Sequence, residues 1–154
     1  MYQLIEMAII TLAGSASLAS SSELPNMIGN WRTVRHGAEV LIIDCGNGSP
    51  CGRLVSVGSD IRGRHTSDVR NRNPALRNRS LKSLPIFWGY SHGKKGWTNG
   101  RLYNPETGQT FRSSLKLINR NRLRVTGCLG LFCRSQTWTR IKPNRNSTNR
   151  KQNR

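Results

Sequence analysis

Residues 97–140 read WTNGRLYNPETGQTFRSSLKLINRNRLRVTGCLGLFCRSQTWTR, and the pattern of these residues is the main evidence for the fold. Apolar and polar side chains alternate along residues 109–118, so that Phe111, Leu115 and Leu117 share one face while the opposite face is polar. A period of two is typical of a β-strand in a sheet with one face on a core. The alternation therefore predicts a sheet at the centre of this protein.

Turn signals divide the same stretch into short segments. Residues 104–108 read NPETG, where Pro105 fixes one φ angle and Gly108 can adopt the positive φ that closes a turn. Residues 119–121 read NRN and form the next turn. A four-stranded antiparallel meander is therefore predicted, with strands at residues 97–103, 109–118, 123–128 and 135–141. Because only one of its faces is apolar, the rest of the chain must cover that face.

Four more short strands are predicted before the meander, at residues 29–35, 38–44, 52–57 and 84–90. Residues 58–82 are polar and rich in arginine, so we expect a long loop there with at most one helical turn near Pro74. Residues 91–96 are predicted to form a tight turn. Eight short strands separated by turn signals suit a sandwich or a barrel. An eight-stranded up-and-down barrel can fill its interior with side chains or hold one small ligand.

Several distinctive sequence blocks are spaced along most of the chain: IGNWRT (28–33), CGRLV (51–55), Asp68 followed by NPALRNRSL (73–81), Trp97, Gly100, LYNPETGQTF (102–111), LRVTGCLGLFC (123–133) and SQTWTR (135–140). Together these blocks resemble the bacterial family called DUF2147. The family has no settled biochemical function, and the resemblance implies a small exported protein with a lipocalin-like β-barrel. The expected fold is therefore all-β, an eight-stranded antiparallel lipocalin-like barrel over residues 23–141.

The two ends of the chain differ from this domain. Residues 7–14 are apolar and small residues follow up to position 22, which predicts an export signal at residues 1–22, although the first six residues contain no lysine or arginine. The alternative is a short N-terminal helix of the folded protein. Residues 142–154 have no large apolar side chain and carry five cations, which predicts a disordered basic tail. We expect a periplasmic or secreted protein, without a transmembrane span because the apolar stretch is too short.

Four cysteines in an exported protein indicate two disulfides, and three pairings are possible. We favour Cys45 with Cys51 and Cys128 with Cys133, because each pair flanks its own turn and antiparallel neighbours bring Cα atoms into bonding range. The alternative is a zinc site. The C-x5-C and C-x4-C spacings and the oxidising location argue against it, so we expect no metal and no cofactor.

The net charge is extreme, with 25 lysines and arginines against 7 acidic residues, or +18. Such a charge favours anionic partners such as nucleic acid or an anionic membrane surface. The alternative is a basic surface with nothing specifically bound, because the arginines are scattered singly among asparagine and serine. The first functional hypothesis is a monomeric exported barrel that binds a small, partly apolar ligand. The second is nonspecific polyanion binding through the scattered arginines and the basic tail.

An enzymatic function has the least support. The chain lacks the Gly-x-Ser-x-Gly nucleophile motif, and residues 89–95 (GYSHGKK) are one residue short of a phosphate loop and end in lysine. His36, His65 and His92 are far apart and fall in predicted turns. We therefore expect no catalytic residues, and an esterase or isomerase site assembled only in three dimensions is the third hypothesis.

The long loop between the third and fourth strands is the place where we expect ligand-binding residues, because such loops can carry function. Asp68, Asn73 and Arg79 match polar positions of the family and are the candidates. The alternative is structural. Asp68 and Asn73 would then hydrogen-bond the backbone within a lid, and Arg79 would pair with Asp68.

Trp31 and Arg140 are predicted to meet where the barrel closes. Trp31 lies on the first strand and Arg140 on the last, and these two strands pair in an up-and-down barrel because closure removes both sheet edges. The lipocalin-like resemblance implies the same contact, with the Trp of a Gly-x-Trp motif packed under an arginine. The alternative is that Trp31 is an ordinary core residue and Arg140 an exposed cation.

Overall fold

The computed structural model describes residues 23–58 and 66–143, so the predicted export signal and nearly all of the predicted tail lie outside the described residues. The elements are α1 (Leu24–Met27), β1 (Gly29–Arg32), β2 (Glu39–Asp44), β3 (Pro50–Ser56), the 3-10 helix η1 (Pro74–Leu76), β4 (Pro85–Trp88), β5 (Ser91–Gly93), β6 (Gly96–Asn104), β7 (Gln109–Asn119), β8 (Arg122–Leu129) and β9 (Phe132–Arg140). Over these two ranges, no helix is long and apolar enough to cross a membrane.

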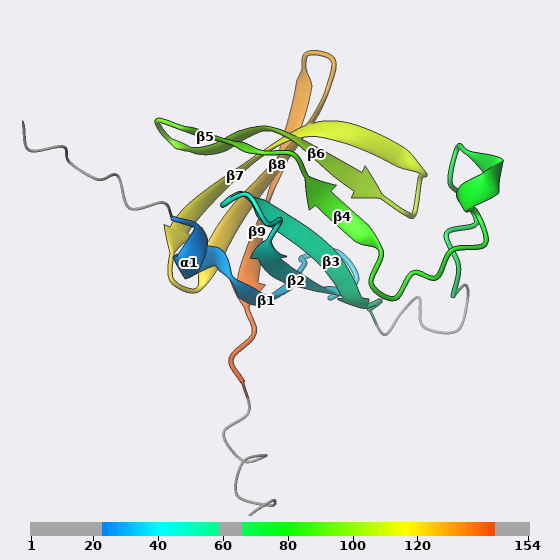
Figure 1. The fold of residues 1–154 in the computed structure, drawn as a ribbon, viewed down its shortest axis with the longest axis horizontal. Helices are drawn as coiled ribbons and strands as arrows, with labels where there is room; N and C mark the ends of the chain where they lie inside the picture. Colours follow the sequence, from blue (N-terminus) through cyan, green and yellow to red (C-terminus); the bar gives the residue numbers. More distant parts are fainter. Residues whose placement is uncertain (1–22, 59–65, 144–154) are drawn as a thin grey trace, which may run out of the picture.

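The strands form one closed antiparallel barrel (Figure 1). Their order is β4-β3-β2-β1-β9-β8-β7-β6-β5, and an additional pairing of β4 with β6 closes the sheet. Phe87 of β4 pairs with Leu102 of β6, while Ser91 of β5 pairs with Thr98 further along the same strand. β4 and β5 therefore act as two halves of one broken strand. The barrel has eight strands by this count, which confirms the predicted fold class.

The prediction of a tight turn at residues 91–96 was wrong in part. Ser91–Gly93 forms β5, and only the two lysines at positions 94 and 95 make the turn into β6. The break that separates β5 from β4 falls at Gly89, whose φ is +73°. Glycine adopts this left-handed conformation without steric cost, so the chain can bend there and then resume pairing with β6.

The period of two predicted for β7 is present in the barrel. Ser113 and Leu115 are buried, Ser114 between them is half-buried, and the flanking Arg112 and Lys116 are exposed. The inward residues also align across strands, since Leu115 lies opposite Val125 of β8. The core is a ring of such inward side chains contributed by all parts of the sheet.

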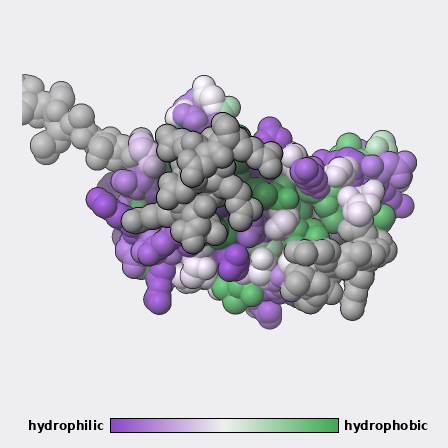
Figure 2. All heavy atoms as spheres, turned by 90° about the horizontal axis from the view of Figure 1, so that it is seen from below, coloured by the Kyte–Doolittle hydropathy of each residue, from purple (hydrophilic) through white to green (hydrophobic). Residues whose placement is uncertain are grey.

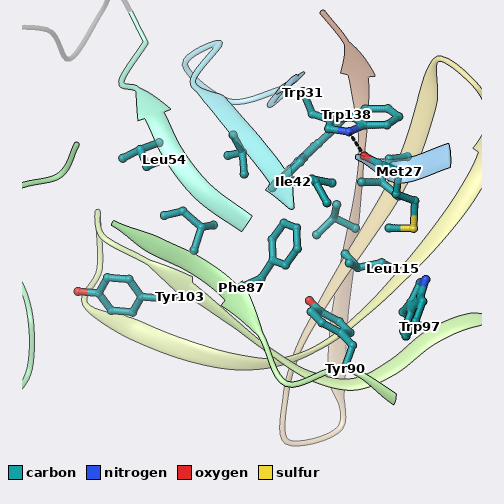
Figure 3. Close-up of a cluster of buried hydrophobic side chains, with 14 of the residues drawn as sticks. Met27, Trp31, Ile42, Leu54, Phe87, Tyr90, Trp97, Tyr103, Leu115 and Trp138 are labelled. Atoms are coloured by element: carbon teal, nitrogen blue, oxygen red, sulfur yellow. Dashed lines mark hydrogen bonds between the residues drawn. The ribbon is translucent and has the colours of Figure 1, made fainter. Parts of the chain in front are cut away.

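One end of the barrel is closed by α1, which the sequence did not predict. Leu24 and Met27 of this short helix are buried against the core, and the indole Nε1 of Trp31 donates a hydrogen bond of 2.8 Å to the carbonyl oxygen of Met27 (Figure 3). Trp31 itself has no exposed surface. The helix thus covers this end of the barrel, because its apolar side chains exclude water from the core there.

Arg140 completes the same closed end. It pairs with Trp31 across β1 and β9, and its guanidinium carbon lies 4.3 Å from the centre of the Trp31 ring. The guanidinium also donates to three carbonyl oxygens, those of Ile28 (2.8 Å), Arg120 (2.5 Å) and Asn26. Burial lowers the pKa of Arg140 from its ordinary value. The contact is the one predicted from the sequence, and it ties α1, β1, β9 and the β7–β8 turn together.

Two disulfides are present, Cys45–Cys51 and Cys128–Cys133, with no free cysteine in the described part of the chain. Cys128 and Cys133 pair directly across β8 and β9, whereas Cys45, the residue after the end of β2, is bridged to Cys51 of β3. This is the favoured pairing of the three that the sequence allows. In both pairs the antiparallel strands bring the two Cα atoms close together, to 5.2 Å for Cys45–Cys51 and 4.0 Å for Cys128–Cys133.

Candidate ligand-binding cavity

A cavity of about 780 Å³ occupies the barrel at the end opposite α1. The β6–β7 turn lies at its rim, whereas the β7–β8 turn at the far end of β7 contacts Arg140 and the closed end. The volume lies within the range of about 300–1,000 Å³ that is usual for small-molecule sites. The barrel is therefore packed at one end and hollow at the other.

The walls of the cavity are largely apolar and come from most of the strands. The apolar lining residues on the strands are Val40, Leu54, Ile86, Leu102, Phe111, Val125, Leu129, Phe132 and Trp138. Viewed from below, the molecule has a mainly hydrophilic surface on which hydrophobic residues emerge in the middle (Figure 2). Such a lining removes apolar ligand surface from water, and this transfer is the main source of affinity in sites of this kind.

Arg134 places a cation inside this apolar lining. It lies opposite Gly127 of β8, which in turn lies opposite Ser113 of β7, and all three positions face the barrel interior. Gly127 has no side chain, so the space in front of Arg134 stays open. Within residues 23–58 and 66–143, the Arg134 guanidinium makes no hydrogen bond or ion pair. An unpaired guanidinium with a planar array of donors is suited to a carboxylate or a similar oxyanion.

The rim of the cavity carries charges that are already neutralised. Glu106 is the one acidic residue among the described residues that line the cavity, and its carboxylate lies 3.4 Å from Arg35 and 2.9 Å from Nε2 of His36. Arg70 donates a 2.6 Å hydrogen bond to the backbone oxygen of Glu106. The acid at the rim is thus engaged with Arg35 and His36 and does not compensate Arg134. Among the described residues that line the cavity, three arginines (Arg35, Arg70 and Arg134) stand against this one acid.

Asp68, the first predicted ligand-binding residue, is buried in a hydrogen-bonded cluster beside the cavity. Its carboxylate accepts bonds from the Tyr103 hydroxyl (2.6 Å), the Asn71 amide (2.8 Å) and the Arg79 guanidinium (2.9 and 2.8 Å). Burial, followed by the hydrogen bond and the negative charge of Asp68, raises the pKa of Tyr103 to about 12. Figure 3 shows the Tyr103 hydroxyl directed away from the core cluster. This cluster fastens the long loop to β6.

The other two predicted residues also have structural partners. The Asn73 side chain accepts a hydrogen bond from the backbone of Ala75 and caps η1, and Arg79 pairs with Asp68 as described above. Neither Asn73 nor Arg79 lines the apolar cavity; both line a second, separate hollow that includes Trp88. The arrangement supports the structural alternative for the three residues. Their role in ligand binding stays a prediction.

The loop and the β6–β7 turn approach so closely that the turn requires glycine. Gly108 has a φ of +67°, and a Cβ built there would lie 1.8 Å from the backbone oxygen of Arg70. The sequence predicted the positive φ but not the contact with the loop. Because the loop is seated against this turn, Ser67, Val69 and Arg70 are held at the cavity rim.

Sequence reasoning missed Arg134. The signal that could have found it is the alternation along β9, where Arg134, Gln136 and Trp138 occupy successive inward positions. The indole of Trp138 donates weakly to Gln136 at 3.4 Å, so the inward face of β9 changes from apolar to polar toward the open end. In the two described ranges, no three His, Cys, Asp or Glu side chains gather closely enough to hold a metal ion.

A closed eight-stranded antiparallel barrel with an apolar cavity at one end defines a lipocalin-like protein. The chain belongs to the family described as an uncharacterized protein conserved in bacteria (DUF2147), whose sequence pattern matches residues 29–140. It is similar to the solved structure of protein HP1028 from Helicobacter pylori, which is described as belonging to the lipocalin family. The TM-score is 0.67 with 25% identity, over 87% of this chain and 92% of the other. No curated protein matches the sequence.

Proposed function

We propose that this protein binds a small amphiphilic molecule whose apolar part lies among the cavity walls and whose acidic group contacts Arg134. The lipocalin-like fold is consistent with small-molecule binding in general. The observation that supports the finer proposal is an unpaired guanidinium on an inward position of a largely apolar cavity. Arg134 is solvent-exposed within this open cavity and has no counter-charge among the described residues, so a ligand carboxylate could supply a charge-assisted partner.

The proposal is tested by calorimetric titration of the purified protein with dodecanoate and with dodecanol. The two probes share an apolar chain and differ in the acidic group, so dodecanoate should bind more tightly by about tenfold, the scale of one charge-assisted hydrogen bond. Arg134→Gln should abolish this preference and leave dodecanol binding unchanged. Arg124→Gln is the matched control, because Arg124 is exposed on a neighbouring position of β8 and does not line the cavity. Equal binding of both probes by the unsubstituted protein would disprove the role of Arg134.

A cavity-filling variant tests whether binding occurs inside the barrel at all. Gly127 lines the cavity, and a Cβ at this position would meet Leu102 and Phe111 only at ordinary contact distances of 3.4 and 3.6 Å. The Gly127→Leu variant should therefore fold, and its affinity for dodecanoate and for dodecanol should fall by a similar factor. Unchanged affinity for both would place the bound molecules outside the cavity.

We further propose that residues 1–22 are an export signal and that the mature protein acts in the periplasm or outside the cell. The two disulfides and the bacterial family favour an extracytoplasmic protein. Mass spectrometry of protein from its source should find a mature N-terminus near residue 23 and no free thiol without reductant. Protein that keeps Met1 and four titratable thiols would contradict this proposal.

A further inference from the structure

The tip of the β8–β9 hairpin, residues 129–132, carries large apolar side chains without a partner in the fold. Leu131 is 96% exposed and Phe132 is 85% exposed, more than any other large hydrophobic side chain in the described ranges, and Leu129 is 55% exposed. The hairpin stands out from the barrel as a separate projection (Figure 1). Contiguous apolar side chains in this position mark an interaction surface, since their exposure to water is unfavourable.

The hairpin tip is held in one conformation. The Cys128–Cys133 disulfide closes its base, and Leu129 pairs with Phe132 immediately beyond the bridge. The carbonyl oxygen of Gly130 in the turn accepts a 3.1 Å hydrogen bond from Arg112 of β7. A surface that is already ordered loses little conformational entropy when it binds, so the tip is prepared for contact.

Two arginines lie in one row at the base of the tip, and neither forms an ion pair with an acidic side chain of the described residues. Arg112 lies opposite Cys128 in the sheet, and Arg101 of β6 lies opposite Arg112, so both occupy the same exposed outer row as the disulfide. The sequence contains no aspartate or glutamate after Glu106. Like charges on directly opposite strands repel one another, and an anionic partner would relieve this repulsion.

We propose that residues 129–132 dock into the surface of a lipid bilayer that contains anionic lipids. Leu131 and Phe132 would enter the headgroup region, while Arg101 and Arg112 would contact lipid phosphates. A second copy of this chain is a poorer partner because it carries the same charge of +18. Single-stranded nucleic acid is bound through rows of aromatic side chains, whereas this tip has one phenylalanine and two leucines.

Docking would also have a consequence for the cavity. Leu129 and Phe132 line the cavity as well as the tip, so the open end of the barrel would face the bilayer. The inference nevertheless does not depend on the proposed ligand, because vesicle binding is measured without any added amphiphile. If the protein does not bind vesicles, the proposed role of Arg134 in ligand binding is unaffected. If it does not prefer dodecanoate over dodecanol, the proposed docking of residues 129–132 is unaffected.

The test is co-sedimentation of the full, oxidised chain with sucrose-loaded vesicles. Vesicles of equal parts phosphatidylglycerol and phosphatidylcholine are compared with vesicles of phosphatidylcholine alone, at low and high salt. The protein should bind the anionic vesicles at low salt, bind neutral vesicles far less, and release as salt screens the arginines. Leu131→Asp should weaken binding by about tenfold or more, the scale of one buried leucine.

Ile118→Asp is the matched control for Leu131→Asp, because it introduces the same negative charge and also replaces an exposed apolar side chain. Ile118 is 43% exposed beside the β7–β8 turn, at the other end of β8 from the tip, and its replacement should leave vesicle affinity unchanged. Equal weakening by both substitutions would overturn the inference and leave only nonspecific charge attraction. Absence of binding to anionic vesicles at low salt would overturn it too. So would a concentration-dependent dimer that Leu131→Asp removes, because the tip would then be a self-association surface.

Discussion

The two ends of the barrel are built from the same strands but have opposite properties. At the closed end, Trp31 is fully buried under Arg140, and its indole donates a hydrogen bond to the carbonyl oxygen of Met27, which is also fully buried. At the open end, the same strands β8 and β9 continue into a hollow and then into the exposed tip around Leu131. The difference shows that one continuous alternating sheet can enclose a packed core at one end of the barrel and a cavity at the other end. What changes between the halves is the side chains that fill the middle.

The largest effect should come from breaking the closed end. Trp31→Ala removes a fully buried indole and should lower the free energy of unfolding by about 3–5 kcal/mol. Phe111→Ala is the matched change at the open end, where the ring is half-buried along the cavity and less than about 1 kcal/mol is expected. Urea unfolding with the disulfides intact measures both. Equal losses would mean that the two ends are packed alike.

A smaller effect is expected where the loop is fastened to the open end. Tyr103→Phe removes the donor that bonds Asp68 and leaves a buried carboxylate with one partner fewer, which should cost about 1–3 kcal/mol. Urea unfolding at neutral pH gives the value. Ser114→Ala on β7 is a control because it alters a half-buried hydroxyl outside this cluster. No loss for Tyr103→Phe would show that the loop is held by its backbone contacts alone.

The same tyrosine predicts a dependence on alkaline pH. Its pKa rises from 10.0 in the unfolded chain to about 12 in the fold, so the protonated hydroxyl is the form that the fold stabilises. The stabilisation is complete below pH 10 and is lost as the pH rises from 10 toward 12. Burial also raises the pKa of Tyr90, which therefore contributes in the same direction. Unfolding followed over this range should be less pH-dependent in Tyr103→Phe; an identical profile would contradict the assignment.

Arg140→Lys tests how the closed end is joined, with an expected loss of about 0.5–2 kcal/mol. An ammonium cannot stack over the Trp31 ring and reach three carbonyl oxygens at once, as the guanidinium does. Arg140→Lys should lower the free energy of unfolding by less in a Trp31→Ala background, because the ring that stacks on the guanidinium is then absent. Strictly additive losses in the double variant would remove the ring contact as a source of stability.

The smallest effect on stability is expected at Arg134. Arg134→Gln removes no hydrogen bond or ion pair within the described residues, so the free energy of unfolding should stay within about 0.5 kcal/mol of the original value. Thermal unfolding measures this shift, and the dodecanoate titrations measure the accompanying loss of binding. A large loss of stability would show that Arg134 stabilises the fold, as Arg140 does, and the two arginines of β9 would then not differ in role.

The sequence alone determined the sheet, the closure and the covalent bridges. The alternation along residues 109–118, the turn at 104–108 and the spacing of cysteines are local patterns, and they predicted β7, the Gly108 conformation and both disulfides. The pairing of Trp31 with Arg140 followed from topology, because the first and last strands of a barrel must meet. The short helix α1 escaped prediction since four residues give no helical period, and β5 escaped because a glycine break hides the continuation of a strand.

The position of the hollow and the side chains that face it depend on contacts between distant residues, which local sequence patterns do not specify. Arg134 and Arg140 are alike in the sequence, both inward-facing arginines on β9, yet one has an unpaired guanidinium and the other lies on an indole. Likewise Asp68 is distant in sequence from Tyr103, and folding brings their side chains to 2.6 Å. The physical reason is that the alternation along a strand specifies on which face of the sheet a side chain lies. How closely that side chain is packed depends on which side chains of other strands fill the space around it.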